Sequence, residues 1–227
     1  MAYLPKIAHT RAVSVTMAVR LPSWDMQFGL PPVFEMNLPE GVLCERLRLT
    51  FAKATGTFDE FDLLSIVGRS KLGRIRITGQ KEQLQEDVPF QSVDEILSRR
   101  RGGDLFRYLI DKFATISDIS GVQPKVLVRD EGASVALSKV THSLPQGCRG
   151  ATHIVKFWEQ NEYPQPAANE FFCLKVAEKC GLDVPPRRLA EDARALVIDR
   201  LDLRPDGTYR GFEDFCVLNA SRTDEKY

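Results

Sequence analysis

The spacing of apolar residues predicts two helices and one strand in the first third of the chain. A helix is expected over about 40–51, where apolar residues recur on one side at helical spacing. A shorter helix is expected to begin near Asp59, a residue type that caps helix N-termini, and to end at Gly68. Arginine and isoleucine then alternate over residues 73–79, which predicts a half-buried strand.

Charged residues dominate the next stretch, and strands dominate after it. Residues 92–113 predict two helical pieces broken at the pair Gly102 and Gly103, so the best domain boundary lies here. Beyond it, the runs KVLVRD, SVALSKV, THIVKFW and ARALVIDRLDL predict strands. One helix interrupts them in the run ANEFFCLKVAEKCGL, with Gly181 as its stop. The pattern as a whole predicts an α+β fold.

Composition and charge change this picture little. The chain has 227 residues, of which 43% are hydrophobic and 27% charged, which is typical of a globular protein with a proper core. Its formal net charge of +0 gives no overall field that would attract nucleic acid or an acidic membrane. The five cysteines are scattered without a C-x-x-C pair, which indicates neither a zinc site nor a disulfide framework. No apolar run is long enough to span a membrane, and no secretory signal opens the chain, so we expect a cytoplasmic protein without membrane contact.

The stretch ISGVQPK carries the first candidate chemistry. It places Ser120 and Gly121 at the mouth of a strand that opens with Lys125. Small residues, inward-facing backbone N–H groups and a nearby cation are what a phosphate-holding loop requires. An ordinary turn before a strand has the same composition and is the more frequent explanation.

A strand lysine and a helix carboxylate form the second candidate. Lys156 lies inside an apolar strand, where an ammonium group is costly without a partner, and Glu170 follows on the next predicted helix. Protein kinases hold the phosphates of ATP with such a pair. A solvent-exposed edge lysine and an acid in a first helical turn explain the two residues equally well. Similarly, Asp199 marks either a hinge beside an adenine or the point where a buried strand emerges.

The chain resembles, block by block, the N-terminal half of the HipA-type serine/threonine protein kinases, the toxins of bacterial toxin–antitoxin pairs. The resemblance covers about residues 21–227 and rests on LPPVFEMNLPEG, FDLLSIVGRSKLGRI, ISGVQPKVLV, THIVKF, NEFFCLKVAEKCGLDVP, ALVIDRLD and EDFCVLNASRTDEKY. It implies a protein-kinase-like fold in which an N-terminal subdomain precedes a β-rich nucleotide-binding lobe. It also implies ATP with Mg²⁺ for the complete enzyme, a DNA-binding antitoxin of the HipB type, and a protein substrate of the aminoacyl-tRNA synthetase class. Contact with DNA is implied only through the antitoxin.

The same resemblance assigns the phosphate end of an ATP site residue by residue. Ser120 and Gly121 match the phosphate-proximal loop, and Lys125 lies next to it. Lys156 matches the lysine on the ATP phosphates, and Glu170 is its expected partner.

Two further assignments concern the hinge and regulation. Asp199 and Leu201 match positions that touch the adenine and ribose. Ser120 matches the regulatory autophosphorylation serine, while Asp118 stands where some members carry another serine. The carboxylate of Asp118 either mimics part of a phosphoserine's charge or belongs to a simple turn.

No residue matches the catalytic aspartate of a kinase, the asparagine five residues after it, or the second aspartate that binds magnesium. Asp214 and Asn219 have the five-residue spacing of a catalytic loop, but they follow Leu201 too soon for the helices that must lie between. The three histidines also lack a catalytic context. We therefore expect the chain to begin one or two strands late, to end before the catalytic machinery, and to be inactive in phosphotransfer by itself.

The predicted organisation has four parts. They are a HipA-type N-terminal subdomain (1–80), a charged helical linker (81–115), a kinase N-lobe (116–203) and the start of a largely missing C-terminal catalytic lobe (204–227). The predicted function is that of a HipA-like serine/threonine kinase toxin acting in growth control and persistence. Two alternatives stay open: a non-catalytic antitoxin- or nucleotide-binding module from a truncated or split kinase gene, and a plain interaction domain in which SGVQPK is only a turn.

Overall fold

The structure, a computed structural model, describes most of the chain as alternating helical and strand-rich parts. The described residues are 2–25, 29–55, 58–79, 84, 87–98, 105–117, 119, 121, 123–131, 134–137, 140–144, 148–158 and 165–222. The elements in chain order are η1 (His9–Arg11), α1 (Pro32–Glu35), α2 (Gly41–Thr55), α3 (Glu60–Val67), α4 (Val93–Leu97), α5 (Leu105–Phe113), η2 (Ala114–Ile116), β1 (Lys125–Val128), β2 (Ser134–Leu137), β3 (Val140–Ser143), β4 (His153–Phe157), α6 (Pro166–Lys179), β5 (Arg187–Leu189), β6 (Ala195–Asp199) and α7 (Phe215–Leu218).

Helices α2 and α3 confirm the two helices predicted from the apolar spacing. Helix α3 begins at a capping box: the Asp59 carboxylate accepts hydrogen bonds from the N–H groups of Phe61 and Asp62, and the Asp62 carboxylate accepts one from the Asp59 N–H. Its last turn ends at Gly68, whose N–H donates to the Leu64 carbonyl over 2.9 Å. Local sequence signals are therefore sufficient to place this helix.

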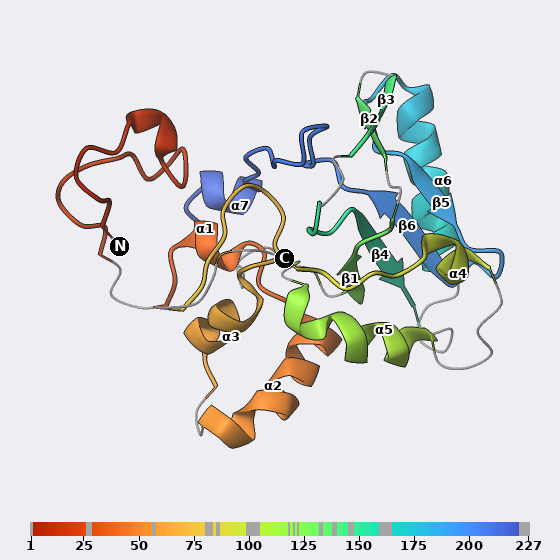
Figure 1. The fold of residues 1–227 in the computed structure, drawn as a ribbon, viewed down its shortest axis with the longest axis horizontal. Coiled ribbons are helices and arrows are strands. Elements are labelled where there is room, and N and C mark those ends of the chain that lie inside the picture. The colour runs from red at the N-terminus through yellow and green to blue at the C-terminus, as the bar shows by residue number, and fades with distance from the viewer. Residues whose placement is uncertain are drawn as a thin grey trace.

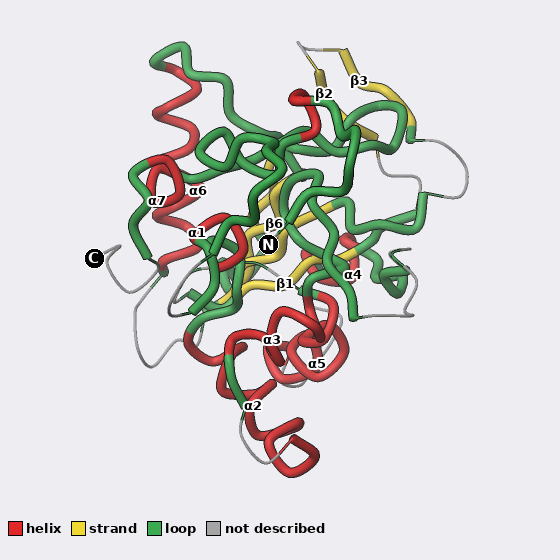
Figure 2. The backbone as a smooth tube through the Cα atoms, turned by 90° about the vertical axis from the view of Figure 1, so that its left-hand side faces the viewer, coloured by secondary structure: helices red, strands yellow, loops and turns green. Residues whose placement is uncertain are grey.

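An antiparallel four-stranded sheet forms the second half of the molecule. Its strand order is β1-β4-β6-β5, and the hairpin β2–β3 lies in the connection from β1 to β4. Helix α6 covers one face of the sheet, and α4 and α5 lie against the other (Figures 1 and 2). The sheet is thus the middle layer of three.

Alternate side chains along the strands pack into two separate apolar clusters. Leu196 and Ile198 of β6 pack with Phe171 and Leu174 of α6. On the other face, buried residues join the main core formed with the helices of the first half: Val126, Val155, Val197, Leu109, Phe113, Leu47 and Leu64. Because neighbouring positions on a strand point to opposite faces, the register fixes which polar residues of the sheet can meet.

Residues 73–79 form no strand, so this part of the prediction is wrong. The N–H of Ile77 donates to the carbonyl of Gly68 at the end of α3 over 2.9 Å, and no partner strand accepts the segment within the described residues. Ile75 packs with the cluster around α1 and α7, whereas Ile77 packs with the main core. The alternation therefore reflects two different burial sites along an irregular segment.

The other differences concern the boundaries of short elements. Strand β2 occupies the first four residues of the predicted run SVALSKV, and its antiparallel partner β3 begins at the last residue of that run and extends beyond it. The short strand β5 and helix α1 had no prediction, because three- and four-residue elements carry too little periodicity. The predicted helix break at Gly102 and Gly103 lies outside the described residues.

The last described segment of the chain packs against its first residues. Helix α7 lies beside α1 (Figures 1 and 2), and Val217 is buried against Met17, Val33 and Met36. The carboxylate of Glu213 accepts hydrogen bonds from the Ser14 hydroxyl over 2.7 Å and from the Val15 N–H over 3.0 Å. These contacts join residues about 200 positions apart into one cluster.

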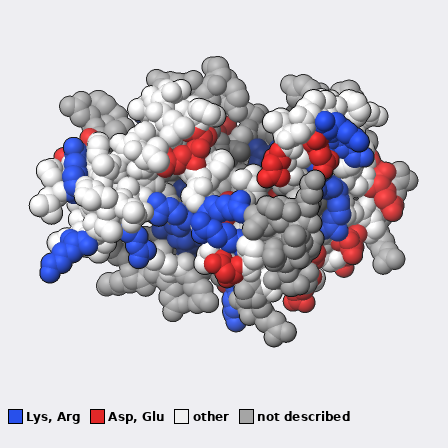
Figure 3. Space-filling model, turned by 90° about the horizontal axis from the view of Figure 1, so that it is seen from above, with Lys and Arg blue, Asp and Glu red and all other residues white. Residues whose placement is uncertain are grey.

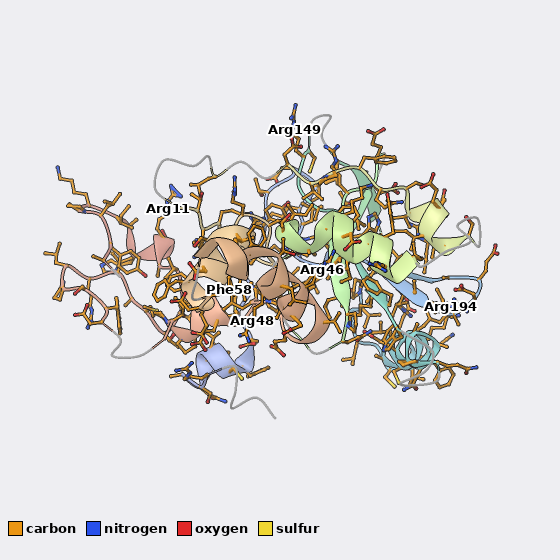
Figure 4. All side chains as sticks on the ribbon, turned by 90° about the horizontal axis from the view of Figure 1, so that it is seen from below. Arg11, Arg46, Arg48, Phe58, Arg149 and Arg194 are labelled. Carbon is orange, nitrogen blue, oxygen red and sulfur yellow. The ribbon has the colours of Figure 1, made fainter. Side chains whose placement is uncertain are left out.

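An ion pair connects the helices of the first half. Arg46 of α2 lies between α2 and α5 (Figure 4), and its Nη2 is 2.6 Å from an Asp111 carboxylate oxygen. Both side chains are nearly half exposed, so this link contributes little to stability.

The surface is not evenly charged. Lys and Arg side chains gather across the middle of the face seen from above (Figure 3).

Among the described residues, no helix has the length and apolar character needed to cross a membrane.

Candidate nucleotide-binding site

Two lysines meet on the face of the sheet that α6 covers. Lys125 of β1 lies directly opposite Lys156 of β4, so both side chains point to the same face. Lys156 in turn lies opposite Leu196 of β6, which packs against α6. Two like charges facing each other across strands are unfavourable unless anionic groups lie nearby. The arrangement therefore suits a site for negatively charged oxygens.

One such anionic group is supplied by α6. The Lys156 ammonium forms a hydrogen-bonded ion pair with the Glu170 carboxylate, and both side chains are partly buried. Helix α6 begins at Pro166, so Glu170 projects from its first turns toward the sheet. The structure thus brings together the strand lysine and the helix carboxylate that the sequence suggested as a pair.

The loop before β1 is built for close approach to Lys125. Gly121 has a φ of +116°, a left-handed conformation that side chains rarely adopt. A Cβ atom at this position would collide with the Lys125 ammonium group. Only glycine combines this backbone conformation with this contact. Ser120 and Asp118, the predicted phosphate-loop and regulatory positions, lie outside the described residues.

The two predicted hinge residues differ in exposure and surroundings. Leu201 is 52% exposed. Asp199 lies opposite His153, and its carboxylate is 3.4 Å from His153 Nε2. Because Ile198 points toward α6, its neighbour Asp199 points to the other face, away from Lys156. The Asp199 side chain is therefore held by a histidine, and its predicted contact with nucleotide stays a prediction.

His153 was not recognised as part of this region from the sequence. It is 4% exposed, and its Nδ1 is 2.8 Å from the Thr152 hydroxyl oxygen, so both ring nitrogens have a polar neighbour. In the sequence, only the Thr152–His153 pair at the start of a strand hinted at this role. Its contact with Asp199 becomes evident only once the β4–β6 register is known.

A second group that sequence analysis missed follows directly after β6. Arg200 and Asp202 form a buried ion pair in which the Arg200 Nη2 lies 2.6 Å from the Asp202 carboxylate. The signal was present as two acids flanking an arginine at the end of an apolar strand.

Asp214 has a local structural role. Its carboxylate accepts a hydrogen bond from the Val217 N–H over 2.9 Å and so caps α7. The sequence argument that Asp214 and Asn219 do not form a catalytic loop stays a prediction. Within the described residues, there is also no group of three or more side chains of the types that bind metal ions.

Two family models match successive parts of the chain. The HipA N-terminal domain matches residues 1–78, and the HipA-like C-terminal domain matches residues 117–227. The chain is also similar to the curated protein named "Putative kinase Y4dM" from Sinorhizobium fredii, with 27% identity over 213 residues. That match covers 87% of this chain and 46% of the relative, so the chain spans about half the length of the curated protein it matches.

A similar fold is found among solved structures. The chain resembles one from the complex of HipA, HipB and operator DNA of the Shewanella oneidensis MR-1 toxin–antitoxin system, with a TM-score of 0.51 and 21% identity. The match covers 86% of this chain and 45% of the other. It confirms the predicted fold class, a mixed helical and antiparallel kinase-like architecture. The bounds of the four predicted parts stay predictions.

Proposed function

Because the chain belongs to the HipA family, we propose that it provides the nucleotide-binding lobe of an ATP-dependent serine/threonine kinase toxin. The ion pair between Lys156 and Glu170 carries this proposal, since protein kinases use the same combination to hold ATP phosphates. The chain spans about half of its relatives, so the activity of a whole kinase is itself part of the proposal.

Each residue of the site has a distinct role in the proposal. Lys156 donates N–H groups to phosphate oxygens, and Glu170 fixes the direction of its ammonium group. Lys125 adds a second cation, and Gly121 lets the loop backbone approach it closely. ATP fits this donor set, because the two lysines carry two positive charges on one face.

The remaining parts of the proposal rest on the family resemblance. Asp199 and Leu201 lie near the adenine and ribose, and Ser120 is the regulatory phosphorylation site. Mg²⁺ supplies charge neutralisation at the phosphates in the complete enzyme. We further propose a cytoplasmic protein with a HipB-type antitoxin partner, DNA contact through that partner, and a substrate of the aminoacyl-tRNA synthetase class. The solved complex of HipA with HipB and operator DNA supports the antitoxin partner.

Nucleotide titration of the chain tests the proposal. We expect ATP to bind weakly, because one lobe buries only part of a ligand, and Lys156→Met to weaken binding about tenfold or more. Lys175→Met is the matched control, since Lys175 lies on the same helix as Glu170 but over the Phe171 ring, 4.8 Å from its centroid. Chemical-shift mapping should show perturbations around β1, β4 and the first turns of α6. Perturbations confined to another surface, or equal losses in both variants, would contradict an ATP site here.

A non-catalytic module is the second candidate function. It is supported by the local role of Asp214, which caps α7 and belongs to the one aspartate–asparagine pair in the sequence with catalytic spacing. On this view the chain binds nucleotide or antitoxin without transferring phosphate. Incubation with radiolabelled ATP distinguishes the two candidate functions. Transfer of phosphate to a protein or to the chain itself, abolished by Lys156→Ala, would exclude the non-catalytic function.

A further inference from the structure

The three residues after β6 alternate between burial and exposure. Arg200 and Asp202 are each 2% exposed, whereas Leu201 between them is 52% exposed. Burying two charged side chains is costly unless each is paired and hydrogen-bonded. The pattern therefore indicates that the flanking charges hold this segment in one fixed conformation, with Leu201 facing outward.

The Arg200 guanidinium donates two parallel hydrogen bonds to the Asp202 carboxylate. Nε donates to one carboxylate oxygen over 2.9 Å, and Nη2 donates to the other over 2.6 Å. This fork geometry fixes the relative orientation of the two side chains as well as their separation.

The pair also reaches across to the N-terminal subdomain. Arg200 Nη2 donates to the backbone carbonyl of Lys71 over 2.9 Å, and the Gly73 N–H donates to the Asp202 carboxylate over 2.7 Å. Gly73 has a φ of +83°, a backbone conformation that favours glycine. Residues 71–73 and the segment after β6 are thus joined by two hydrogen bonds between buried groups.

Further contacts fix the same segment. The guanidinium groups of Arg200 and Arg76 lie 4.4 and 4.2 Å from the centroid of the Tyr209 ring. The Arg200 N–H donates to the Thr152 carbonyl over 3.0 Å, and the Arg210 N–H donates to the Asp202 carbonyl over 2.7 Å. Backbone and side chains therefore both tie the segment to its surroundings.

We infer that Arg200 and Asp202 are positioning residues, which set the hinge of the nucleotide site by attaching it to residues 71–73 of the N-terminal subdomain. The inference rests on the proposed function, because it takes Leu201 to lie where adenosine binds. It assigns to the N-terminal subdomain a part in forming the adenosine end of the site. The inference predicts that the phosphate end, formed by Lys156 and Glu170, does not depend on this attachment.

Separate probes for the two ends of the nucleotide test the inference. Adenosine reports on the hinge, and inorganic tripolyphosphate reports on the lysines. Arg200→Lys keeps the charge but cannot make the fork with Asp202 and reach the Lys71 carbonyl at once. We expect adenosine to bind about tenfold more weakly to this variant, because a small displacement of the hinge misplaces Leu201 against the adenosine. Tripolyphosphate affinity should stay unchanged, because the lysines are not displaced.

Amide hydrogen exchange gives a readout that needs no ligand. The Gly73 amide should exchange about tenfold faster in Arg200→Lys, because its acceptor Asp202 is no longer held in place. Arg46→Lys is the control, since it alters an arginine–carboxylate link between α2 and α5 away from the hinge. If Arg200→Lys does not fold, the double variant Arg200→Met with Asp202→Leu replaces the pair by apolar groups and keeps the core filled.

The outcomes separate the inference from the proposed function. A parallel loss of both probes, or unchanged adenosine binding and unchanged Gly73 exchange, overturns the inference. A native chain that binds neither probe contradicts the proposed function. In that case Gly73 exchange decides the attachment alone: faster exchange in the variant upholds it, and unchanged exchange overturns it.

Discussion

At the scale of single residues, the site depends on the contact between Gly121 and the Lys125 ammonium group. The glycine supplies a left-handed backbone, and its missing side chain leaves the space that the ammonium occupies. The contact therefore sets where the second cation of the site lies. Any side chain at position 121 affects both the backbone and this cation.

Gly121→Ala should destabilise the chain and weaken phosphate binding. The left-handed backbone is expected to cost about 1–2 kcal/mol in the free energy of unfolding. The new Cβ would also displace the Lys125 ammonium, so tripolyphosphate should bind more weakly. Urea unfolding and ligand titration measure the two effects. Gly211→Ala is the control, because a Cβ there meets Arg74 at an ordinary 3.5 Å; equal effects of both substitutions would refute the special role of Gly121.

Cys44 should be alkylated more slowly than the exposed Cys173 and Cys180. Burial raises the pKa of its thiol, and the positive charge of Arg48 offsets this only in part. The raised pKa lowers the fraction of reactive thiolate at about pH 8, and the difference should narrow as the pH rises through the thiol pKa. Mass spectrometry after iodoacetamide treatment compares it with the exposed Cys173 and Cys180. Faster labelling of Cys44 than of these two in the folded chain would contradict the prediction, and unfolded chain in urea serves as the reference.

The residues of the candidate site differ in how far the sequence reveals them. Lys156 and Glu170 could be paired because a lysine within an apolar strand needs a carboxylate, and one follows on the next helix. Arg200 and Asp202 could not be placed, since their partners at residues 71–73 are about 130 positions away. His153 is similar: its contact with Asp199 depends on the strand register.

At the scale of elements, signals confined to a few neighbouring residues were reliable. Helix α3 was predicted with both ends, because its capping residue and its terminating glycine act within one turn. The alternation over residues 73–79 misled because it records burial against two clusters and not strand pairing. The periodicity of the sequence thus identified which residues are buried. Whether they form a strand depended on hydrogen bonds to a partner strand, which the periodicity does not reveal.

Asp59→Ala should weaken α3 at its N-terminus. The substitution removes the acceptor for the N–H groups of Phe61 and Asp62, which is expected to cost about 1 kcal/mol of stability. Thermal or urea unfolding measures the loss. Asp94→Ala provides the control, because Asp94 lies in the first turn of α4 with a side chain that is 91% exposed. A loss of the same size in both variants would show that general charge effects, and not capping, are responsible.

At the scale of the whole molecule, the two ends of the described chain form one unit. The cluster around α1 and α7 contains residues from the first 40 positions together with Val217. The four-part division predicted from the sequence separates these ends, and nothing in the local pattern indicates that they meet. The zero net charge likewise conceals the gathering of Lys and Arg on one face (Figure 3).

Val217→Ala tests how far α7 stabilises the N-terminal subdomain. The side chain is 1% exposed, and its truncation should cost about 2 kcal/mol. Trp24 packs against the same cluster and Trp158 against the cluster under α6, so their fluorescence reports on the two regions. The region around Trp24 should unfold at a lower urea concentration in the variant. Leu218→Ala, at a 42% exposed neighbour, should have little effect; a larger loss there would disprove the docking argument.

The bonds from Ser14 and Val15 to Glu213 also fix the order in which the protein takes shape during its synthesis. A ribosome adds roughly 5–20 residues per second, so the first residues wait on the order of 10–40 seconds before their partner exists. Until then, Met17, Val33 and Met36 lack Val217 and expose apolar surface. This cluster can therefore be completed only after Val217 has been synthesised, so its final packing is a late event.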